Sequence, residues 1–369
     1  MNYVVRYSDL PKQYAALRSE TRQCLDEVFG SGSFILRQDV EDFELRMSDL
    51  LDVDHVIGVN SGTDALYLSL RALGIGAGDE VITVAHTFAA TVAAIVHCGA
   101  KPVLVDIRDD FNMDVTQLEG AISDFTRAII PVHLNGRVCE MDTIMAVAQR
   151  HDLAVVEDAA QALSAQYRGQ AAGNFGDAGG FSLHPLKNLS VGGDGGFVTT
   201  NNNQLDSTLR LLRNHGQKSK EEIPCFGFNS RLDNLHAALA LMKLKYLPKW
   251  MDRRRFLAGR YHEGLQDVPG LVLPPPPEEE SPYYDVFSSY VLRTKRRDQL
   301  QLHLDEAGIE VYAHWPTPLH HQKGLGLERW HLPMTERVAQ EVLSLPLYPE
   351  LANQDQELVI HTIRGFFGV

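Results

Sequence analysis

Between residues 55 and 160 the chain alternates short apolar runs with amphipathic ones, and this alternation restricts its possible folds more than any other feature. The apolar runs are rich in Val and Ile and are bounded by turn residues, which predicts strands: HVIGVN, EVITVA, KPVLVDI, RAIIPVH and LAVVED. The runs between them have apolar residues at helical spacing: TDALYLSLRALG, FAATVAAIVHCGA and MDTIMAVAQRHD. Together they predict an α/β fold with a mostly parallel sheet covered by helices on both faces.

Two later segments carry similar patterns. GGFVTT, residues 195–200, predicts another strand, and a helix is expected near 203–213. From Arg231 to Leu247, apolar residues recur at three- and four-residue steps, which predicts a helix that Pro248 should end. Its apolar face is typical of a core or subunit contact rather than of a ligand site.

The composition changes after about residue 250. A connector rich in Pro and Glu, VPGLVLPPPPEEESP, excludes regular structure. Beyond it we expect a strand, VFSSYVLRT, and two helices, near 296–308 and 356–366. We therefore predict a large domain over residues 1–250 and a smaller C-terminal α+β domain over residues 251–369.

Charge and cysteine usage exclude several classes of function. The chain has 369 residues and a formal net charge of −14, which disfavours nucleic acid and anionic membranes as partners. Its four cysteines are widely spaced and form no C-x-x-C pair, which argues against a metal site and a disulfide framework. No run reaches the roughly 18 apolar residues of a membrane span. We expect a cytoplasmic protein.

A lysine and an acid, each just beyond a predicted strand, are the strongest functional signal. Lys187 stands in FSLHPLKNLSVGGDGGF, and Asp158 ends the apolar run LAVVED. In isolation such a lysine is typical of a solvated loop, and such an acid is typical of a helix N-cap. Pyridoxal phosphate needs a lysine for its Schiff base and an acid beside its pyridinium nitrogen. The pair therefore indicates pyridoxal 5'-phosphate as cofactor.

Short strings spread along the whole chain extend this interpretation. The matching strings are SGSFI, NSGTDAL, HTFAAT, GAKPVLVDI, VEDAAQAL, FSLHPLKNL, GDGG, RNHG, NSRLDNLHAALAL, PTPLHHQ and LSLPLYPEL. With them the chain resembles, nearly end to end, the DegT/DnrJ/StrS family of sugar aminotransferases. These are fold-type-I pyridoxal phosphate enzymes, and the resemblance implies a seven-stranded sheet in the large domain.

The resemblance also assigns roles at the cofactor. Lys187 would carry the Schiff base and then move the proton, while Asp158 would pair with the pyridinium nitrogen. Gln161 would contact the ring hydroxyl and Phe88 would stack on the ring. The phosphate would be held by Gly62, Thr63 and Ser182, together with Asn229 from the partner subunit of a homodimer. Arg231 would serve the same interface or the donor carboxylate.

The implied reaction moves an amino group from L-glutamate or glutamine to a keto-sugar, usually nucleotide-linked, for amino-sugar biosynthesis in a cell-surface polysaccharide or secondary metabolite. An alternative acceptor is unlinked: a keto-cyclitol, a keto-sugar phosphate or a keto-acid sugar. A non-catalytic sensor that kept the fold is a further alternative.

The acceptor site is where this chain departs from the family pattern. Arg37 follows SGSFIL where many relatives have Gly-Pro, and Arg137 stands in a loop that usually has other residues. Arginines suit an anionic acceptor group, although both could equally be surface residues. His320, in PTPLHHQ, is a candidate for the rim of the active site. No metal is expected.

Overall fold

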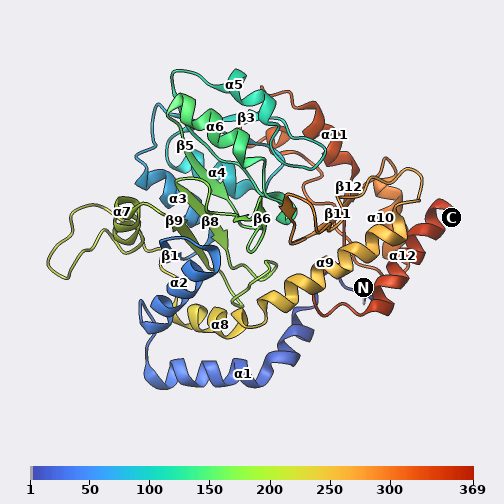
Figure 1. Ribbon diagram of the computed structural model, residues 1–369, viewed down its shortest axis with the longest axis horizontal. Helices are drawn as coiled ribbons and strands as arrows, with labels where there is room; N and C mark the ends of the chain where they lie inside the picture. Colours follow the sequence, from blue (N-terminus) through green and yellow to red (C-terminus); the bar gives the residue numbers. More distant parts are fainter. Residues whose placement is uncertain (1–2) are drawn as a thin grey trace.

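The computed structural model describes residues 3–369 (Figure 1). Its largest sheet has seven strands in the order β1-β9-β8-β5-β4-β2-β3. These strands are β1 (His55–Val59), β9 (Gly196–Thr200), β8 (Ala178–Ser182), β5 (Ala154–Asp158), β4 (Thr126–Ile129), β2 (Glu80–Val84) and β3 (Lys101–Val105). All neighbours from β8 to β3 pair in parallel, and only β9 runs antiparallel to its two neighbours. The predicted α/β fold with a mostly parallel seven-stranded sheet is confirmed.

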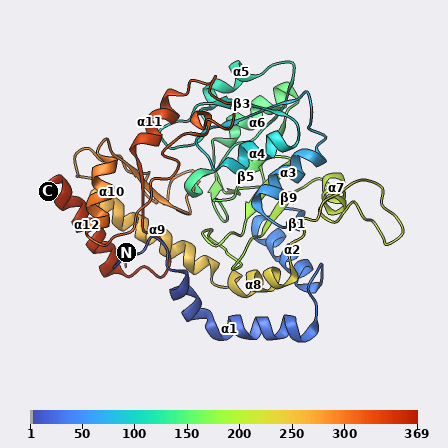
Figure 2. The same ribbon diagram turned by 180° about the vertical axis from the view of Figure 1, so that it is seen from behind.

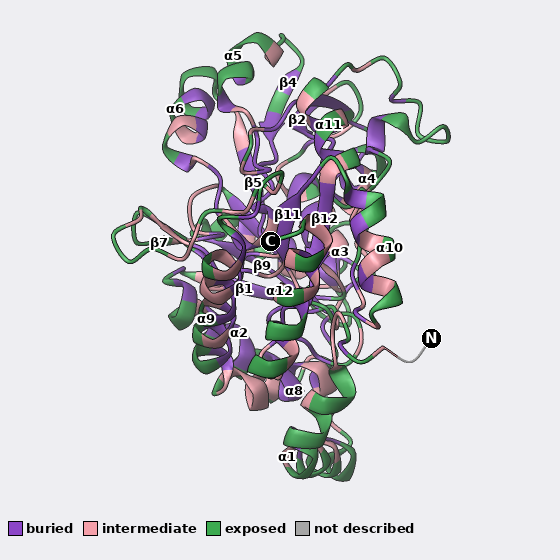
Figure 3. Ribbon diagram, turned by 90° about the vertical axis from the view of Figure 1, so that its right-hand side faces the viewer, coloured by how far each residue is buried: buried purple, intermediate pink, exposed green. Residues whose placement is uncertain are grey.

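Helices cover both faces of this sheet, which is why its strands are apolar along nearly their whole length. On one face, residues of α3 (Gly62–Ala72), α4 (Ala89–His97) and α7 (Asn203–Arg213) pack on the strands. On the other, α2 (Gln38–Leu51), α6 (Met141–His151) and α8 (Asn234–Leu244) contribute to the main core. Figure 3 shows buried strands between helices whose outer faces are exposed.

Two long helices have no counterpart among the sequence predictions. α1 (Leu10–Ser31) buries few of its residues and contacts α8 through Cys24 and Val28. Figures 1 and 2 show it along one edge of the molecule. α9 (Leu247–Leu265) begins where Pro248 was expected to end a helix, so that prediction is wrong. Proline is tolerated in the first turn of a helix because the N–H it lacks has no partner there.

A second core lies at the C-terminal end of α9. Trp250 and Met251 still pack in the main core, whereas Leu257 and Tyr261 belong to the second. Around it lie α10 (Arg297–Glu306) and α12 (Asn353–Phe367), with β11 (Tyr290–Arg293) paired antiparallel to β12 (Val342–Leu345). α11 (Pro333–Glu341) instead contributes Val338 to the main core. Val5, from the other end of the chain, joins this core and forms a bridge with Ile309.

The remaining elements are short. β6 (Gln166–Tyr167), β7 (Gln170–Ala171) and β10 (Tyr283–Tyr284) form a three-stranded sheet. The others are η1 (Val115–Gln117), α5 (Leu118–Ala121), η2 (Leu134–Gly136) and η3 (Leu319–His321). Within residues 3–369 no helix has both the length and the apolar composition needed to cross a membrane. The four cysteines are free thiols, of which only Cys225 is exposed.

Candidate active site

The carboxyl ends of β5 and β8 and the N-terminus of α3 meet at a cavity of about 500 Å³. Ligands of open α/β sheets bind outside the carboxyl ends of the strands, so this is the expected position. Seven of the residues predicted to contact the cofactor line the cavity: Gly62, Thr63, Phe88, Asp158, Gln161, Ser182 and Lys187. The structure therefore brings together residues that are up to 125 positions apart in sequence.

Asp158 is the last residue of β5 and is buried. Its Oδ2 accepts a hydrogen bond from the hydroxyl of Thr91 at 2.7 Å, and its Oδ1 accepts one from the Ala160 N–H at 3.2 Å. The Thr91 hydroxyl lies 2.8 Å from that of Thr87, one turn earlier. These contacts hold the carboxylate in one orientation, with one donor on each oxygen. Thr91 was not predicted, because nothing in its sequence context shows that α4 faces the end of β5.

Lys187 follows β8 by five residues and is held by a turn, in which its backbone N–H donates to the carbonyl of His184 at 2.9 Å. Burial lowers the pKa of its ammonium group, and the negative charge of Asp158 acts in the opposite direction. A lowered pKa raises the fraction of neutral amine, which is the form that attacks a carbonyl or accepts a proton.

The start of α3 forms an anion-binding cradle. Gly62 and Thr63 are its first residues, and helix geometry leaves such N–H groups without intrahelical partners, at the positive end of the helix dipole. A side chain at Gly62 would collide with β8, since a Cβ built there lies 2.8 Å from the Cβ of Ser182. Glycine thus lets the helix start approach Ser182, which lines the same cavity. This donor set suits a phosphate.

Two further side chains suit an aromatic ring in the cavity. Phe88 is the N-cap residue of α4, lines the cavity and is 62% exposed, so its ring is available for stacking. The amide oxygen of Gln161 accepts a hydrogen bond from the Asn135 N–H at 2.8 Å. This bond leaves the amide NH₂ of Gln161 free to donate to a ring hydroxyl. Amine, acid, phosphate cradle and aromatic face together fit pyridoxal phosphate.

Arg254, on α9, is a cavity residue that the sequence did not reveal. Its Nη1 donates to the carbonyls of Leu347 at 2.9 Å, Phe287 at 3.2 Å and Ser288 at 3.3 Å. No carboxylate of residues 3–369 lies within ion-pair distance of it, and burial lowers its pKa to about 10. Its place in the run RRR, residues 253–255, predicts only a solvated helix face.

The other predicted residues lie outside the cavity lining in the described chain. Arg37 is exposed at the N-cap of α2, and Asn229 is exposed where the loop after α7 returns and bridges to Asn214. Arg137 pairs with Asp285 at 2.6 Å. His320 is fully buried and points to Glu336.

Comparisons with known proteins agree with this geometry. The chain matches the DegT/DnrJ/EryC1/StrS aminotransferase family over residues 15–364. A dTDP-3-amino-3,4,6-trideoxy-alpha-D-glucose transaminase from Streptomyces venezuelae is 42% identical, with 98% of this chain and 95% of the relative covered. A UDP-N-acetyl-3-dehydro-alpha-D-glucosamine 3-aminotransferase from Acidithiobacillus ferrooxidans is 41% identical, with 98% of each chain covered.

Solved structures give the same result. S. venezuelae DesV, crystallised in complex with a ketimine intermediate, has a TM-score of 0.95 at 41% identity, with 99% of each chain covered. Similar aminotransferases have been solved in pyridoxal phosphate form or with bound pyridoxamine phosphate. The chain belongs to the DegT/DnrJ/EryC1/StrS aminotransferase family and is a pyridoxal 5'-phosphate-dependent sugar aminotransferase.

Proposed function

We propose that the chain transfers an amino group from L-glutamate to carbon 3 of a nucleotide-linked keto-hexose. The observation that carries this proposal is the convergence of Lys187, Asp158 and the α3 cradle on one cavity. The two relatives described above are named for products or substrates modified at carbon 3 of a nucleotide-linked sugar. Their similarity favours carbon 3 over carbon 4.

Bound pyridoxal phosphate supplies an electron sink for the negative charge that develops at the substrate carbon. Gly62, Thr63 and Ser182 would hold its phosphate, and the carboxylate of Asp158 would keep a proton on its ring nitrogen. Nζ of Lys187 takes the proton from the α-carbon of the donor and, in the second half of the cycle, returns a proton to carbon 3 of the acceptor. Asp158→Asn keeps the shape but removes the charge, so kcat should fall by orders of magnitude.

Arg254 supports a dicarboxylic donor. A buried guanidinium without a carboxylate partner is unfavourable until an anion arrives, and Arg254 lines the same cavity as Lys187. We assign it to a carboxylate of glutamate. Arg254→Lys keeps a charge but loses the planar fork, so it should raise the KM for glutamate while leaving the KM for the acceptor unchanged. Glutamine remains the alternative donor, and the same assay compares the two.

The charges around Arg137 favour the nucleotide-linked acceptor over one with its own anionic group. Arg137 pairs with Asp285 at 2.6 Å and with Asp110 at 3.6 Å, and its guanidinium lies 3.7 Å from the ring centre of Tyr283. Two carboxylates thus already balance its charge. Arg37 is exposed and remains a candidate.

Methionine variants test both arginines. If Arg37 or Arg137 binds an acceptor anion, its loss should raise the acceptor KM roughly ten- to 150-fold, since such a contact is worth about 1.5–3 kcal/mol. The glutamate half-reaction should not change. If the acceptor kinetics are unchanged in both variants, neither arginine binds such an anion. The alternative of an unlinked acceptor with its own carboxylate or phosphate then loses its support.

We also propose a homodimer with active sites shared across the interface. The loop after α7 extends away from the rest of the chain (Figures 1 and 2), and Phe226 on it is 99% exposed. Phe29 and Phe34 form an exposed aromatic pair at the end of α1. Such apolar groups favour burial against a second copy, and Asn229 stands at the end of the same loop.

The free cysteines support the predicted cytoplasmic location.

A panel of keto-sugars tests the acceptor. The protein is first converted to the pyridoxamine form with glutamate, freed of the donor, and then mixed with dTDP- and UDP-linked 3-keto- and 4-keto-hexoses, a keto-cyclitol and a keto-sugar phosphate. We expect a nucleotide-linked 3-keto-hexose to restore the pyridoxal spectrum with the highest kcat/KM. Preference for a 4-keto or an unlinked acceptor would refute the proposal.

A further inference from the structure

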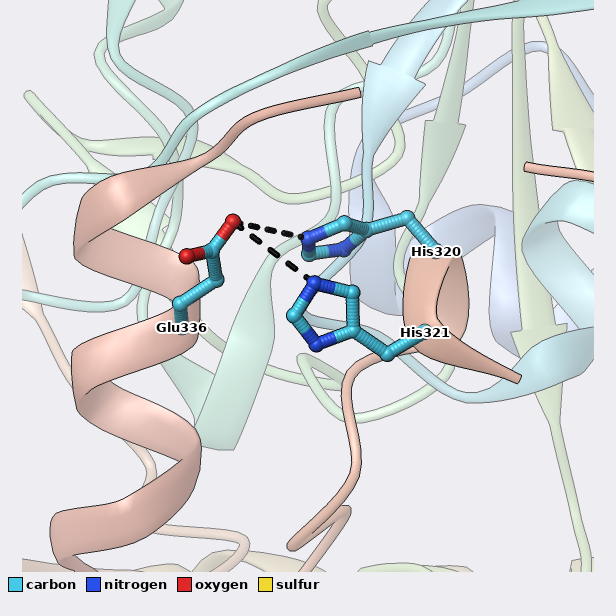
Figure 4. A group of neighbouring side chains, drawn as sticks. All are labelled: His320, His321 and Glu336. Atoms are coloured by element: carbon cyan, nitrogen blue, oxygen red, sulfur yellow. Dashed lines mark hydrogen bonds and ion pairs between the residues drawn. The ribbon is translucent and has the colours of Figure 1, made fainter. Parts of the chain in front are cut away.

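Three imidazoles surround one carboxylate oxygen outside the active-site cavity. Oε1 of Glu336, on α11, lies 3.3 Å from Nε2 of His320 and 3.7 Å from Nε2 of His321 (Figure 4). Nδ1 of His331 lies 3.3 Å from the same oxygen. The ligating atoms of His320, His321 and Glu336 all lie within 4.8 Å of one another. Nothing in the proposed transamination uses this group.

We propose that His320, His321 and Glu336 bind a divalent transition-metal ion, with zinc as the expected ion. In a tetrahedral zinc site the metal–ligand distances are about 2.0–2.1 Å, which separates neighbouring ligand atoms by about 3.3 Å. The separation between Oε1 of Glu336 and Nε2 of His320 equals this value, and that to Nε2 of His321 is 0.4 Å longer. Charged hydrogen bonds between nitrogen and carboxylate oxygen are shorter, about 2.7–2.9 Å. His331, whose Nδ1 lies 3.3 Å from the same Glu336 oxygen, is 81% exposed and is not counted among the ligands.

The donor atoms of these side chains suit a metal. Oε1 of Glu336 also accepts a hydrogen bond from the backbone N–H of Leu332 at 3.1 Å, which helps to fix the carboxylate. Two imidazoles and a carboxylate suit zinc, whereas magnesium and calcium prefer oxygen donors alone. This proposal departs from our sequence prediction, which named no metal.

The backbone around the ligands is already held in place. Leu319 and Leu332, each beside one of the histidines, pack in one buried cluster with Leu327 and residues of the large sheet. The start of α11 is anchored to Asp106, whose side chain accepts from the N–H groups of Met334 at 2.7 Å and Thr335 at 2.8 Å. The ligands therefore lie on fixed elements before any ion binds.

The consequence of binding would be structural. Trp315, which lines the active-site cavity, is only five residues before His320. An ion that joins η3 to α11 would therefore fix the segment that forms one wall of the cavity. Because the ion binds the folded chain, it should raise the melting temperature.

The test uses the full-length protein with pyridoxal phosphate bound, without a polyhistidine tag, in a Cys225→Ser background because that exposed thiol could itself bind zinc. The protein is stripped with a chelator, incubated with Zn²⁺, dialysed and assayed for metal per chain. We expect one equivalent. Glu336→Gln and His321→Gln should each retain less than about a tenth of it. The matched control His361→Gln, an exposed histidine on α12, should retain all of it.

Two further readouts separate the site from loss of folding. Far-ultraviolet circular dichroism should match between the stripped wild type and both ligand variants. Zn²⁺ should raise the melting temperature of the wild type by a few degrees, but not that of Glu336→Gln. Co²⁺ should give the intense visible bands of a four-coordinate ion only in the wild type and the control. Absence of retained zinc in the wild type, or equal retention in both ligand variants, would overturn the proposal.

Discussion

Thr91 is predicted to support catalysis through Asp158, and Thr91→Val tests this with little change of shape. The substitution removes the hydroxyl that donates to Oδ2 of Asp158 at 2.7 Å and leaves only the Ala160 N–H, at 3.2 Å, on the other oxygen. A hydrogen bond to a charged group contributes about 1.5–3 kcal/mol. If the loss appears in the transition state, the rate should fall about ten- to 150-fold, since 1.36 kcal/mol corresponds to tenfold.

Thr83→Val is the matched control. Thr83 is also a buried threonine, on β2, but its hydroxyl donates to the backbone carbonyl of Ile130 at 2.9 Å and not to a carboxylate. Its loss should lower the free energy of unfolding by about 1 kcal/mol and leave the rate unchanged.

The assay is a single-turnover measurement of 2-oxoglutarate formation, with saturating L-glutamate and with each variant fully loaded with cofactor. Under these conditions the observed rate reports the half-reaction and not cofactor affinity. A Thr91→Val rate within twofold of the wild type would refute the argument that this hydroxyl positions the Asp158 carboxylate.

Three further predictions concern other parts of the site. Gly62→Ala should weaken pyridoxal phosphate binding at least tenfold and lower the free energy of unfolding by about 1–3 kcal/mol, because its Cβ clashes with β8. In Gly30→Ala, the control, the added Cβ meets nothing within 4 Å, so neither quantity should change. Cofactor titration measures the first quantity and urea unfolding the second. Burial lowers the pKa of His86 to about 4, so the unfolded chain binds its proton first as pH falls from 6.5. This group should therefore lower the free energy of unfolding by about 2 kcal/mol between pH 7 and pH 5. His86→Phe should abolish this loss, as measured by urea unfolding at each pH. Inactive Lys187→Ala and Asn229→Ala chains, refolded together, should regain part of the activity, whereas a fully active monomer by light scattering would exclude the shared site.

Local patterns predicted six of the seven strands of the large sheet, because each of these is an apolar run between turn residues. They gave no range for β8, whose sequence AGGFS is not an apolar run, and they did not predict the covering helix α2. They missed α1, which buries few residues and packs mainly on another helix through Cys24 and Val28. They also wrongly placed the end of a helix at Pro248, because proline fits the first turn of a helix as well as the position after a helix ends. That ambiguity concealed the whole of α9.

The site residues that could be predicted are those whose side-chain chemistry is distinctive and that stand at the end of a strand. Lys187 and Asp158 each follow a strand of one sheet, so the carboxyl ends of those strands bring them together. Arg254 was not predictable, because it reaches the cavity from α9 across the boundary between the two cores. Glu336 and His320 meet for a similar reason: only the tertiary packing of the segment between them makes them neighbours.

The most direct test of the whole account is the half-reaction with L-glutamate in the absence of any acceptor. We predict that cofactor-loaded protein releases about one 2-oxoglutarate per chain as its spectrum changes to the pyridoxamine form, and that Lys187→Ala, loaded to the same extent, releases none. Failure of the wild type to release 2-oxoglutarate with either L-glutamate or glutamine would favour the non-catalytic sensor. Release by Lys187→Ala at the wild-type rate would show that another group moves the proton and would contradict the role given to Lys187.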